Sequence, residues 1–211
     1  MNTVSTEKAA IEAAARRLFR FGGSHERPRI FLDWALTVKP PHDLFWRFLQ
    51  LEWSGFDAIP HKEYAKLLQS YGTKVKRGGW TRERADDDPW HDLPDTFEIY
   101  RGQSGLHQMG LSWTRDYDTA AMFAHGHRGL RRKVPAIEIM TITKAKVCMV
   151  HDDRDESEIV LWRIPTFAQI SGEHGIDHGV LDVADAAFER RKQKRLGERA
   201  AEEAAKAEAA A

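Results

Sequence analysis

Residues 97–126 read FEIYRGQSGLHQMGLSWTRDYDTAAMFAHG, and this stretch decides the fold class. Its first residues, Phe97–Tyr100, have the apolar and aromatic composition and the period of two that are typical of a strand. Further along, Asp118 can cap a helix over Thr119–His125, with Gly126 near its end. The stretch therefore predicts a β-rich half of the chain that is interrupted by one helix.

Other segments on the C-terminal side share the strand pattern. They are short, rich in Ile, Val and aromatic residues, and bounded by Gly, Pro or Asp. These segments are Ala136–Ile142, Lys146–Val150, Glu158–Trp162 and Thr166–Ile170. Together with Phe97–Tyr100 they predict an antiparallel or mixed sheet.

The first third of the chain shows helical periodicity instead. Apolar residues fall on one helical face at Ile11, Ala14, Ala15, Leu18 and Phe19, before Gly22-Gly23. A second helix is predicted over Asp43–Trp53, and a third carries Tyr64, Leu67, Leu68 and Tyr71 before Gly72. We expect three short helices here, with Trp34, Trp46 and Trp53 in the core or in interdomain packing.

The segment between the helices and the strands is highly charged. Residues 74–92 carry five basic residues and then Asp86-Asp87-Asp88, with Gly78-Gly79 and Pro89 as breakers, which predicts a linker or mobile loop. The whole chain is expected to form one α+β domain with four parts: a helical section (1–75), a charged loop (76–95), a β-rich core (96–188) and a charged Ala-rich tail (189–211). The tail offers almost no apolar face, so we expect it to be a frayed helix or disordered.

Composition limits the class of protein. The 211 residues include 32 basic and 32 acidic ones, and 42% are hydrophobic, which excludes global disorder and leaves no basic excess. Apolar runs are far shorter than the roughly 18 residues of a spanning helix, and the first residues lack a secretory apolar region. We expect a cytoplasmic protein without a membrane partner. The single cysteine, Cys148, lies in an apolar run and is expected to be buried rather than nucleophilic.

Three short stretches of the β-rich half carry the chemistry. They are Tyr100-Arg101-Gly102 at a strand end, Leu111-Ser112-Trp113-Thr114 after a glycine-rich segment, and Asp155-Glu156-Ser157-Glu158 before a strand. Each of them alone is commonly structural, as a surface ion pair, a strand edge or a solvated acidic turn. Their order along the chain is arginine, serine, glutamate.

This order resembles the arginine–serine–glutamate class of mono-ADP-ribosyltransferases, which includes bacterial toxins and phage enzymes. The likeness covers residues 97–170 and includes YRG, GLSWT, a helix ending in MFA and the acidic ESEIV. It implies a split β-sheet core, NAD as the substrate that donates ADP-ribose, and action in a host cytoplasm if a phage encodes the protein.

The resemblance also implies roles for single residues. Glu158 matches the catalytic glutamate, which stabilises positive charge on the ribose as the bond to nicotinamide breaks. Arg101 takes the place of the arginine that binds the cofactor through its two-pronged guanidinium. Gly102 would let the nicotinamide amide approach the main chain. Ser112 would orient the glutamate and the ribose, and Thr114 supports the strand.

Glu156 is the position that the resemblance ties to the acceptor. On a strand, Glu156 and Glu158 would face the same side, with Ser157 turned away. A glutamate at the earlier position goes with arginine as the acceptor in this class, so a target protein with an accessible arginine is the expected partner. The acidic segment 151–155 corresponds to the substrate-recognition loop and would attract a cation.

Other interpretations stay open. In an NAD glycohydrolase, water would replace the acceptor. In a noncatalytic nucleic-acid-binding protein, the basic stretches Lys74–Arg84, Arg128–Lys133 and Lys192–Arg199 would contact phosphates, although the net charge of zero argues against this. No metal site is expected, because the histidines at 125, 127, 174 and 178 lack a completing ligand set. Trp113 and Phe123 are candidates to stack on nicotinamide, and both are equally suited to the core.

Overall fold

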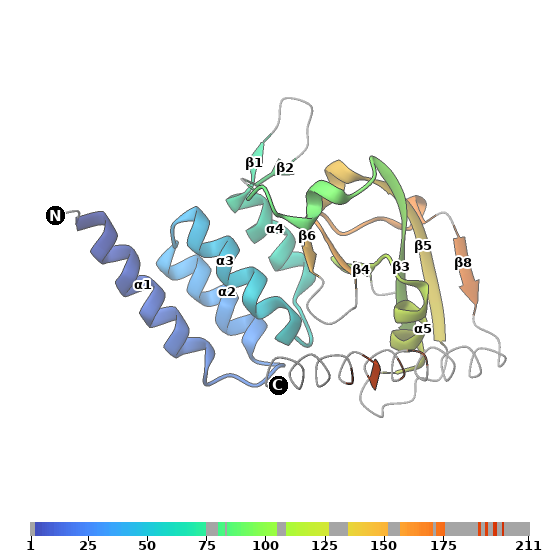
Figure 1. Ribbon diagram of the computed structural model, residues 1–211, viewed down its shortest axis with the longest axis horizontal. Helices are drawn as coiled ribbons and strands as arrows, with labels where there is room; N and C mark the ends of the chain where they lie inside the picture. The colour runs from blue at the N-terminus through green and yellow to red at the C-terminus, as the bar shows by residue number, and fades with distance from the viewer. Residues whose placement is uncertain are drawn as a thin grey trace, which may run out of the picture. The chain divides into compact units, whose positions relative to one another are not determined.

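The computed structural model describes residues 3–74, 80–82, 84–104, 109–126, 135–151, 157–170 and 172–175, with the single positions 190, 193, 196, 197 and 200. The chain divides into two compact units, and each is described by itself. The first unit comprises residues 1–97, 109–113 and 142–167, and the second comprises 98–108, 114–141 and 168–211. Helices and strands together confirm the α+β class (Figure 1).

The helices of the first unit are α1 (Thr3–Phe19), α2 (Arg27–Val38), α3 (His42–Glu52) and α4 (His61–Tyr71), with a 3₁₀ turn, η1, at Trp53–Gly55. The sequence predicts three of these α-helices, and α2 is the one it missed. Its start signal is present, because Pro28 lies in the first turn, where a missing N–H costs nothing. Its buried residues, Phe31, Leu32, Trp34 and Ala35, also lie on one helical face.

Aromatic rings fill the space between these helices. Phe31 is fully buried at the centre of this aromatic core. Its ring centroid lies between 5.4 and 6.3 Å from those of Phe19, Trp34, Phe45, Phe56 and Tyr64. The predicted burial of Trp34, Trp46 and Trp53 is confirmed. Figure 1 shows the helices lying side by side in this unit.

The first unit also contains an antiparallel strand pair from the C-terminal half of the chain. β6 (Val147–His151) pairs antiparallel with β7 (Glu158–Leu161), which confirms both predicted strands. Beside β7 runs β4 (Ser112–Thr114), whose first two residues belong to this unit. The Leu161 N–H donates to the Leu111 carbonyl at 2.9 Å. Cys148 is fully buried in β6, as expected, and burial raises the pKa of its thiol to about 12.

The described part of the charged segment before the strands packs within the first unit. Its described residues include the strands β1 (Thr73–Lys74) and β2 (Trp80–Thr81) and a 3₁₀ turn, η2, at Pro89–Asp92. The guanidinium groups of Arg82 and Arg84 both pair with the buried carboxylate of Asp88, at 2.5 and 3.2 Å. Arg84 also donates to the carbonyls of Val147 and Cys148 on the edge strand β6. The linker prediction is therefore wrong for Arg82 and Arg84, which ion pairing holds in the protein interior.

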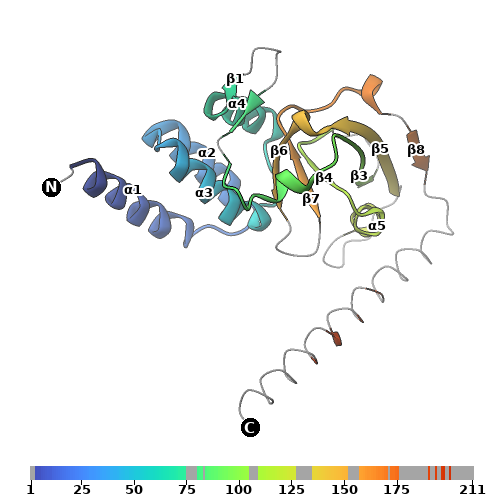
Figure 2. The ribbon, with the colours of Figure 1, turned by 45° about the horizontal axis from the view of Figure 1, so that its top comes forward.

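The second unit is built on β3 (Thr96–Ser104), β5 (Pro135–Thr143) and β8 (Gly172–Gly175), and α5 (Tyr117–His125) packs against β3 and β5 (Figure 2). The first two strands and the helix were predicted. The N-cap of α5 is Asp116 rather than Asp118, because the Asp116 carboxylate accepts the N–H groups of Asp118 and Thr119. Gly126 ends the helix as expected.

The predicted strand Thr166–Ile170 is wrong. A 3₁₀ turn, η4, occupies Phe167–Gln169 instead, and the strand that pairs with β5 is β8. β8 reads GEHG and has no apolar residue, so it carries no pattern that sequence reasoning could recognise. Its register with β5 runs from Ala136 opposite Gly175 to Ile139 opposite Gly172.

Most of the predicted tail lies outside the described residues. Positions 190, 193, 196, 197 and 200 are described, and they are helical. Arg190 pairs with Asp118 at 2.6 Å within the second unit. Over the described part of the chain, no helix has the length and apolar character needed to cross a membrane.

Candidate functional site

Glu158, the expected catalytic carboxylate, opens strand β7 and is half-buried. Its Oε1 accepts a hydrogen bond of 2.8 Å from the indole Nε1 of Trp53. Trp53 lies in η1, 105 positions earlier in the chain, and it is only 2% exposed. The carboxylate is thereby fixed from the helical side of the first unit, in surroundings where solvent screening is reduced.

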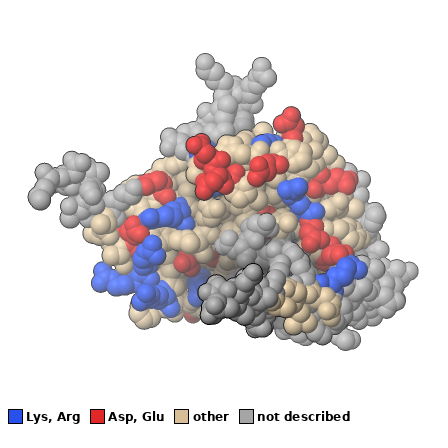
Figure 3. All heavy atoms as spheres, viewed as in Figure 1, with Lys and Arg blue, Asp and Glu red and all other residues tan. Residues whose placement is uncertain are grey.

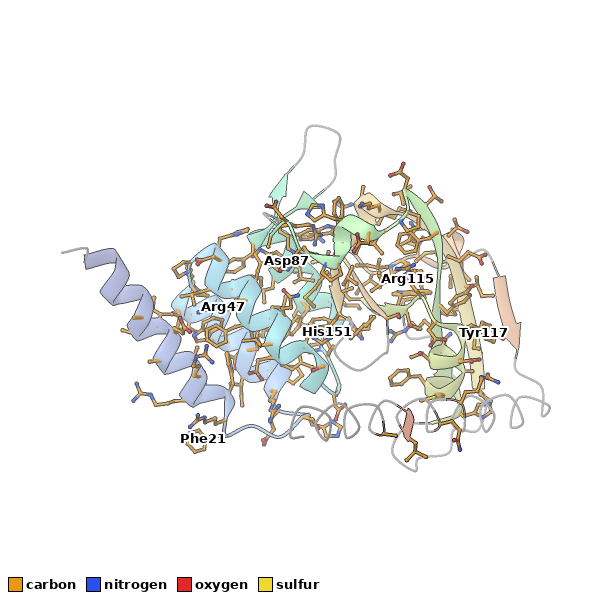
Figure 4. All side chains as sticks on the ribbon, in the orientation of Figure 1. Phe21, Arg47, Asp87, Arg115, Tyr117 and His151 are labelled. Atoms are coloured by element: carbon orange, nitrogen blue, oxygen red, sulfur yellow. The ribbon has the colours of Figure 1, made fainter. Side chains whose placement is uncertain are left out.

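A second contact, made by His151, holds the end of β6, the strand that pairs with β7. His151, the last residue of β6, pairs directly with Glu158 across the β6-β7 ladder. The His151 side chain is labelled in Figure 4. Its Nε2 lies 2.9 Å from the carbonyl oxygen of Gln50 in α3, and because a carbonyl only accepts, Nε2 carries the proton. Both ends of the acidic segment are thus attached to the α3–η1 corner.

Ser112 begins β4, the strand next to β7 in the sheet. The residue before it is fixed twice: the Leu111 N–H donates to Nδ1 of His61 at 3.2 Å, and the Leu111 carbonyl accepts from Leu161. His61 is the first residue of α4. The structure therefore places Ser112 and Glu158 on neighbouring strands of one unit, both braced by the helices. Sequence reasoning found neither His61 nor Trp53, since helix periodicity assigned that region to packing.

The strand that was expected to carry Glu156 and Glu158 does not extend back through Ser157. β7 begins at Glu158, and Ser157 before it has a left-handed φ of 43°. A residue in that conformation is not part of an extended strand, so the period of two cannot be carried back through it. Glu156 and the loop residues 152–155 lie outside the described residues. The expected role of Glu156 toward the acceptor stays a prediction.

The remaining expected site residues belong to the second unit. Arg101 and Gly102 follow Tyr100 in β3, and Tyr100 pairs with Thr114 of β4. The Thr114 hydroxyl accepts the N–H of Asp116 at 3.0 Å, and Asp116 in turn caps α5. Thr114 thus joins the end of its strand to the following helix, which fits the supporting role expected of it.

Gly102 has a packing reason that sequence reasoning did not find. A Cβ at this position would lie 1.9 Å from the carbonyl oxygen of Ala120 and 2.5 Å from the amide nitrogen of Ala124. These are backbone atoms of α5, so they cannot turn aside as a side chain would. The missing side chain allows α5 to lie against β3, and the expected approach of nicotinamide is not needed to explain it.

A buried polar pair accompanies Arg101. Gln103, two residues along β3 and so on the same face, donates to the Glu138 carboxylate of β5. Glu138 is 1% exposed. Its signal in the sequence is a lone acid within the apolar stretch Ala136–Met140, a pattern that marks a specific polar contact.

The aromatic candidates for nicotinamide stacking differ. Trp113 is 2% exposed, and its indole donates to the Gly110 carbonyl at 3.1 Å, which gives it a complete packing role. Phe123 of α5 is half-buried. Within the described ranges, no group of three or more His, Cys, Asp or Glu side chains could hold a metal ion.

Comparison with known proteins adds no assignment: no family model, curated protein or solved structure matches this chain.

Proposed function

We propose that the protein is an NAD-dependent mono-ADP-ribosyltransferase with the split β-sheet fold of that class. It would transfer ADP-ribose to a protein side chain, with arginine as the expected acceptor, and release nicotinamide. The observation that carries the proposal is the Glu158 carboxylate, half-buried at the start of β7 and hydrogen-bonded to the buried indole of Trp53 at 2.8 Å.

The chemistry requires such a carboxylate. When the bond between nicotinamide and ribose breaks, positive charge develops on the ribose, and the departing nicotinamide takes the bonding electrons. A fixed negative charge stabilises this state most when it need not reorient during the reaction. Trp53 supplies the fixation for Glu158, and Ser112 on the neighbouring strand supplies a hydroxyl in the same unit.

The resemblance supplies the other roles. Arg101 would bind the phosphates of NAD, because a guanidinium pairs with two phosphate oxygens at once. Gly102 and Thr114 would shape the strand around it. The acceptor would be a protein arginine, which the negative charge of Glu156 would attract.

An NAD glycohydrolase is the alternative within the same chemistry. It would use Glu158 in the same way, with water as the acceptor of the ribosyl cation. Only the fate of ADP-ribose separates the two enzymes: label on a macromolecule indicates transfer, and free ADP-ribose indicates hydrolysis.

The nucleic-acid-binding alternative loses support. Two of its cations, Arg82 and Arg84, are committed to the buried Asp88 and to main-chain carbonyls. Figure 3 shows Lys and Arg side chains over the end of α1. In the same unit, Arg16 and Arg47 both pair with Glu12. The stretches Arg128–Lys133 and Lys192–Arg199 fall largely outside the described residues.

The test is nicotinamide release from labelled NAD, with and without a cell lysate. Glu158→Gln should lower release by about 100-fold or more, because a neutral amide cannot offset the ribosyl charge. Glu63→Gln is the matched control, since Glu63 is an exposed glutamate of α4 in the same unit. Equal release by the wild type and Glu158→Gln, or no release by the wild type, would rule out the proposed function.

The division of roles between the glutamates is tested in the same assay. Glu156→Gln should preserve slow NAD hydrolysis while stopping the labelling of protein. If both glutamine variants lose hydrolysis to the same degree, Glu156 has no separate role toward the acceptor.

A further inference from the structure

The α3–η1 corner makes two contacts with the end of the β6-β7 ladder. Trp53 donates to Glu158 on one strand, and the Gln50 carbonyl accepts from His151 on the other. His151 and Glu158 are partners in the strand register, and Gln50 and Trp53 are three positions apart in the chain. One turn of helix thereby contacts both members of the His151–Glu158 pair, which ends the β6-β7 ladder.

The Trp53 ring has little freedom to move. It is 2% exposed, and the rings of Phe56 and Tyr64 lie against it at centroid distances of 5.9 and 5.8 Å. An indole has a single polar hydrogen, so its direction is set by the ring plane. The aromatic core therefore determines where the Glu158 oxygen is held.

Other indoles in this unit, the partly buried Trp90 among them, have more ordinary hydrogen-bond partners. Trp90 and Trp113 donate to backbone carbonyls, and Trp46 donates to His42 within its own helix. A buried indole N–H needs an acceptor, and these partners are supplied by fixed or local groups. Trp53 instead donates to the carboxylate of Glu158, a partly exposed side chain 105 positions away in the chain.

We propose that Trp53 is a positioning residue for cleavage of NAD. It does not contact the substrate; it holds the Glu158 carboxylate in the orientation in which that group meets the developing ribosyl charge. The inference rests on the proposed function for its catalytic part, while the coupling between Trp53 and Glu158 can be measured without any reaction.

The catalytic test uses Trp53→Phe, which removes the N–H and keeps an aromatic ring. Its kcat for nicotinamide release should fall roughly 10- to 100-fold, the range expected for a hydrogen bond to a charged group, with KM for NAD little changed. Trp46→Phe is the matched control, because it removes an indole hydrogen bond of 3.0 Å in the same aromatic core that does not involve Glu158. The control should retain kcat close to that of the wild type.

The pH profile separates positioning from general loosening. A hydrogen bond to a carboxylate favours its charged form, so Trp53→Phe should move the acid limb of the kcat profile to higher pH. His151 faces Glu158 across the ladder, so the comparison is made with Trp46→Phe, which leaves both His151 and Glu158 in place. An unshifted limb together with a kcat equal to that of Trp46→Phe would overturn the proposal.

An activity-independent measurement covers the case in which the protein does not cleave NAD. The indole N–H resonance of Trp53, assigned by its loss in Trp53→Phe, should move as Glu158 is titrated with acid, and this response should vanish in Glu158→Gln. If the response is present but the wild type releases no nicotinamide, the proposed function and the catalytic role of Trp53 fail together while the contact stands. If the response is absent, the positioning role fails whether or not NAD is cleaved.

Discussion

Phe31 in the first unit lies between packed helices, and Gly102 in the second lies between a strand and a helix, and the two positions achieve close packing by opposite means. Phe31 is surrounded by five other aromatic rings in the aromatic core. Gly102 removes its own side chain so that the backbone of α5 can approach β3. Large rings stabilise the first unit by the apolar area they bury, whereas small residues stabilise the second by close contact between main chains.

The described ion pairs of the two units also differ in burial. In the first unit, Arg82, Arg84 and Asp88 form a buried ion-pair cluster that reaches the edge strand β6. In the second, the described ion pair between Arg190 and Asp118 is solvent-exposed. The difference predicts that pH and charge substitutions act mainly on the first unit, since exposed pairs contribute little.

Fluorescence can distinguish the units. All 7 tryptophans of the chain, at positions 34, 46, 53, 80, 90, 113 and 162, belong to the first unit. Tryptophan emission therefore reports unfolding of that unit alone, while amide hydrogen exchange reports both.

The largest expected effect is that of Phe31→Ala. Removing a buried phenylalanine should cost about 3–5 kcal/mol, because it removes apolar contacts and leaves a cavity among rings that cannot collapse. Urea unfolding followed by tryptophan emission should show the loss as a lower midpoint. A change below about 1 kcal/mol would mean that the aromatic core is less tightly packed than its ring contacts indicate.

Asp88→Asn should cost about 3 kcal/mol, because it leaves two buried guanidinium groups without a counter-ion. Burial by itself would raise the pKa of Asp88, but the Trp90 N–H and the charges of Arg82 and Arg84 outweigh it and lower that pKa below the ordinary 3.8. This stabilisation is present above pH 3.8 and is lost as pH falls through the lower pKa of the folded state. The wild type should therefore lose stability below about pH 4 more steeply than Asp88→Asn in the same urea experiment.

Gly102→Ala should cost about 1–3 kcal/mol or more, because overpacking here meets backbone atoms rather than a movable side chain. Hydrogen exchange should quicken in β3 and α5 before tryptophan emission changes. Gly23→Ala is the control, since a Cβ there meets only the Glu26 carboxylate oxygen at 3.7 Å. Unchanged exchange in β3 and α5 would show that the two elements accommodate the added Cβ without a loss of stability.

The smallest expected effect is that of Asp116→Ala, about 1 kcal/mol, from the loss of the N-cap of α5. Asp118→Ala is the comparison, because Asp118 was the cap predicted from the sequence and its side chain instead pairs with the exposed Arg190. Faster amide exchange at the start of α5 in the first variant and not in the second would confirm the assignment. Equal effects would contradict it.

Local patterns account for what could be predicted. α1, α3, α4 and α5 and the strands β3, β5, β6 and β7 each carry their own periodicity, so neighbouring residues were enough to find them. β8 could not be found, because its pairing with β5 depends on main-chain atoms and its residues are Gly, Glu and His. The charged segment was misread for a related reason: composition alone does not distinguish a solvated arginine from one that a distant strand buries.

By itself, the sequence determined the α+β class, the burial of Cys148 and of the N-terminal tryptophans, and the order of the arginine, serine and glutamate motifs. Only the tertiary structure decided that Trp53 meets Glu158, that Gly102 serves the packing of α5, and that Arg82 and Arg84 are interior residues. The physical reason is distance along the chain. Periodicity is a property of neighbours, whereas a hydrogen bond across 105 positions exists only after folding has brought its two partners together.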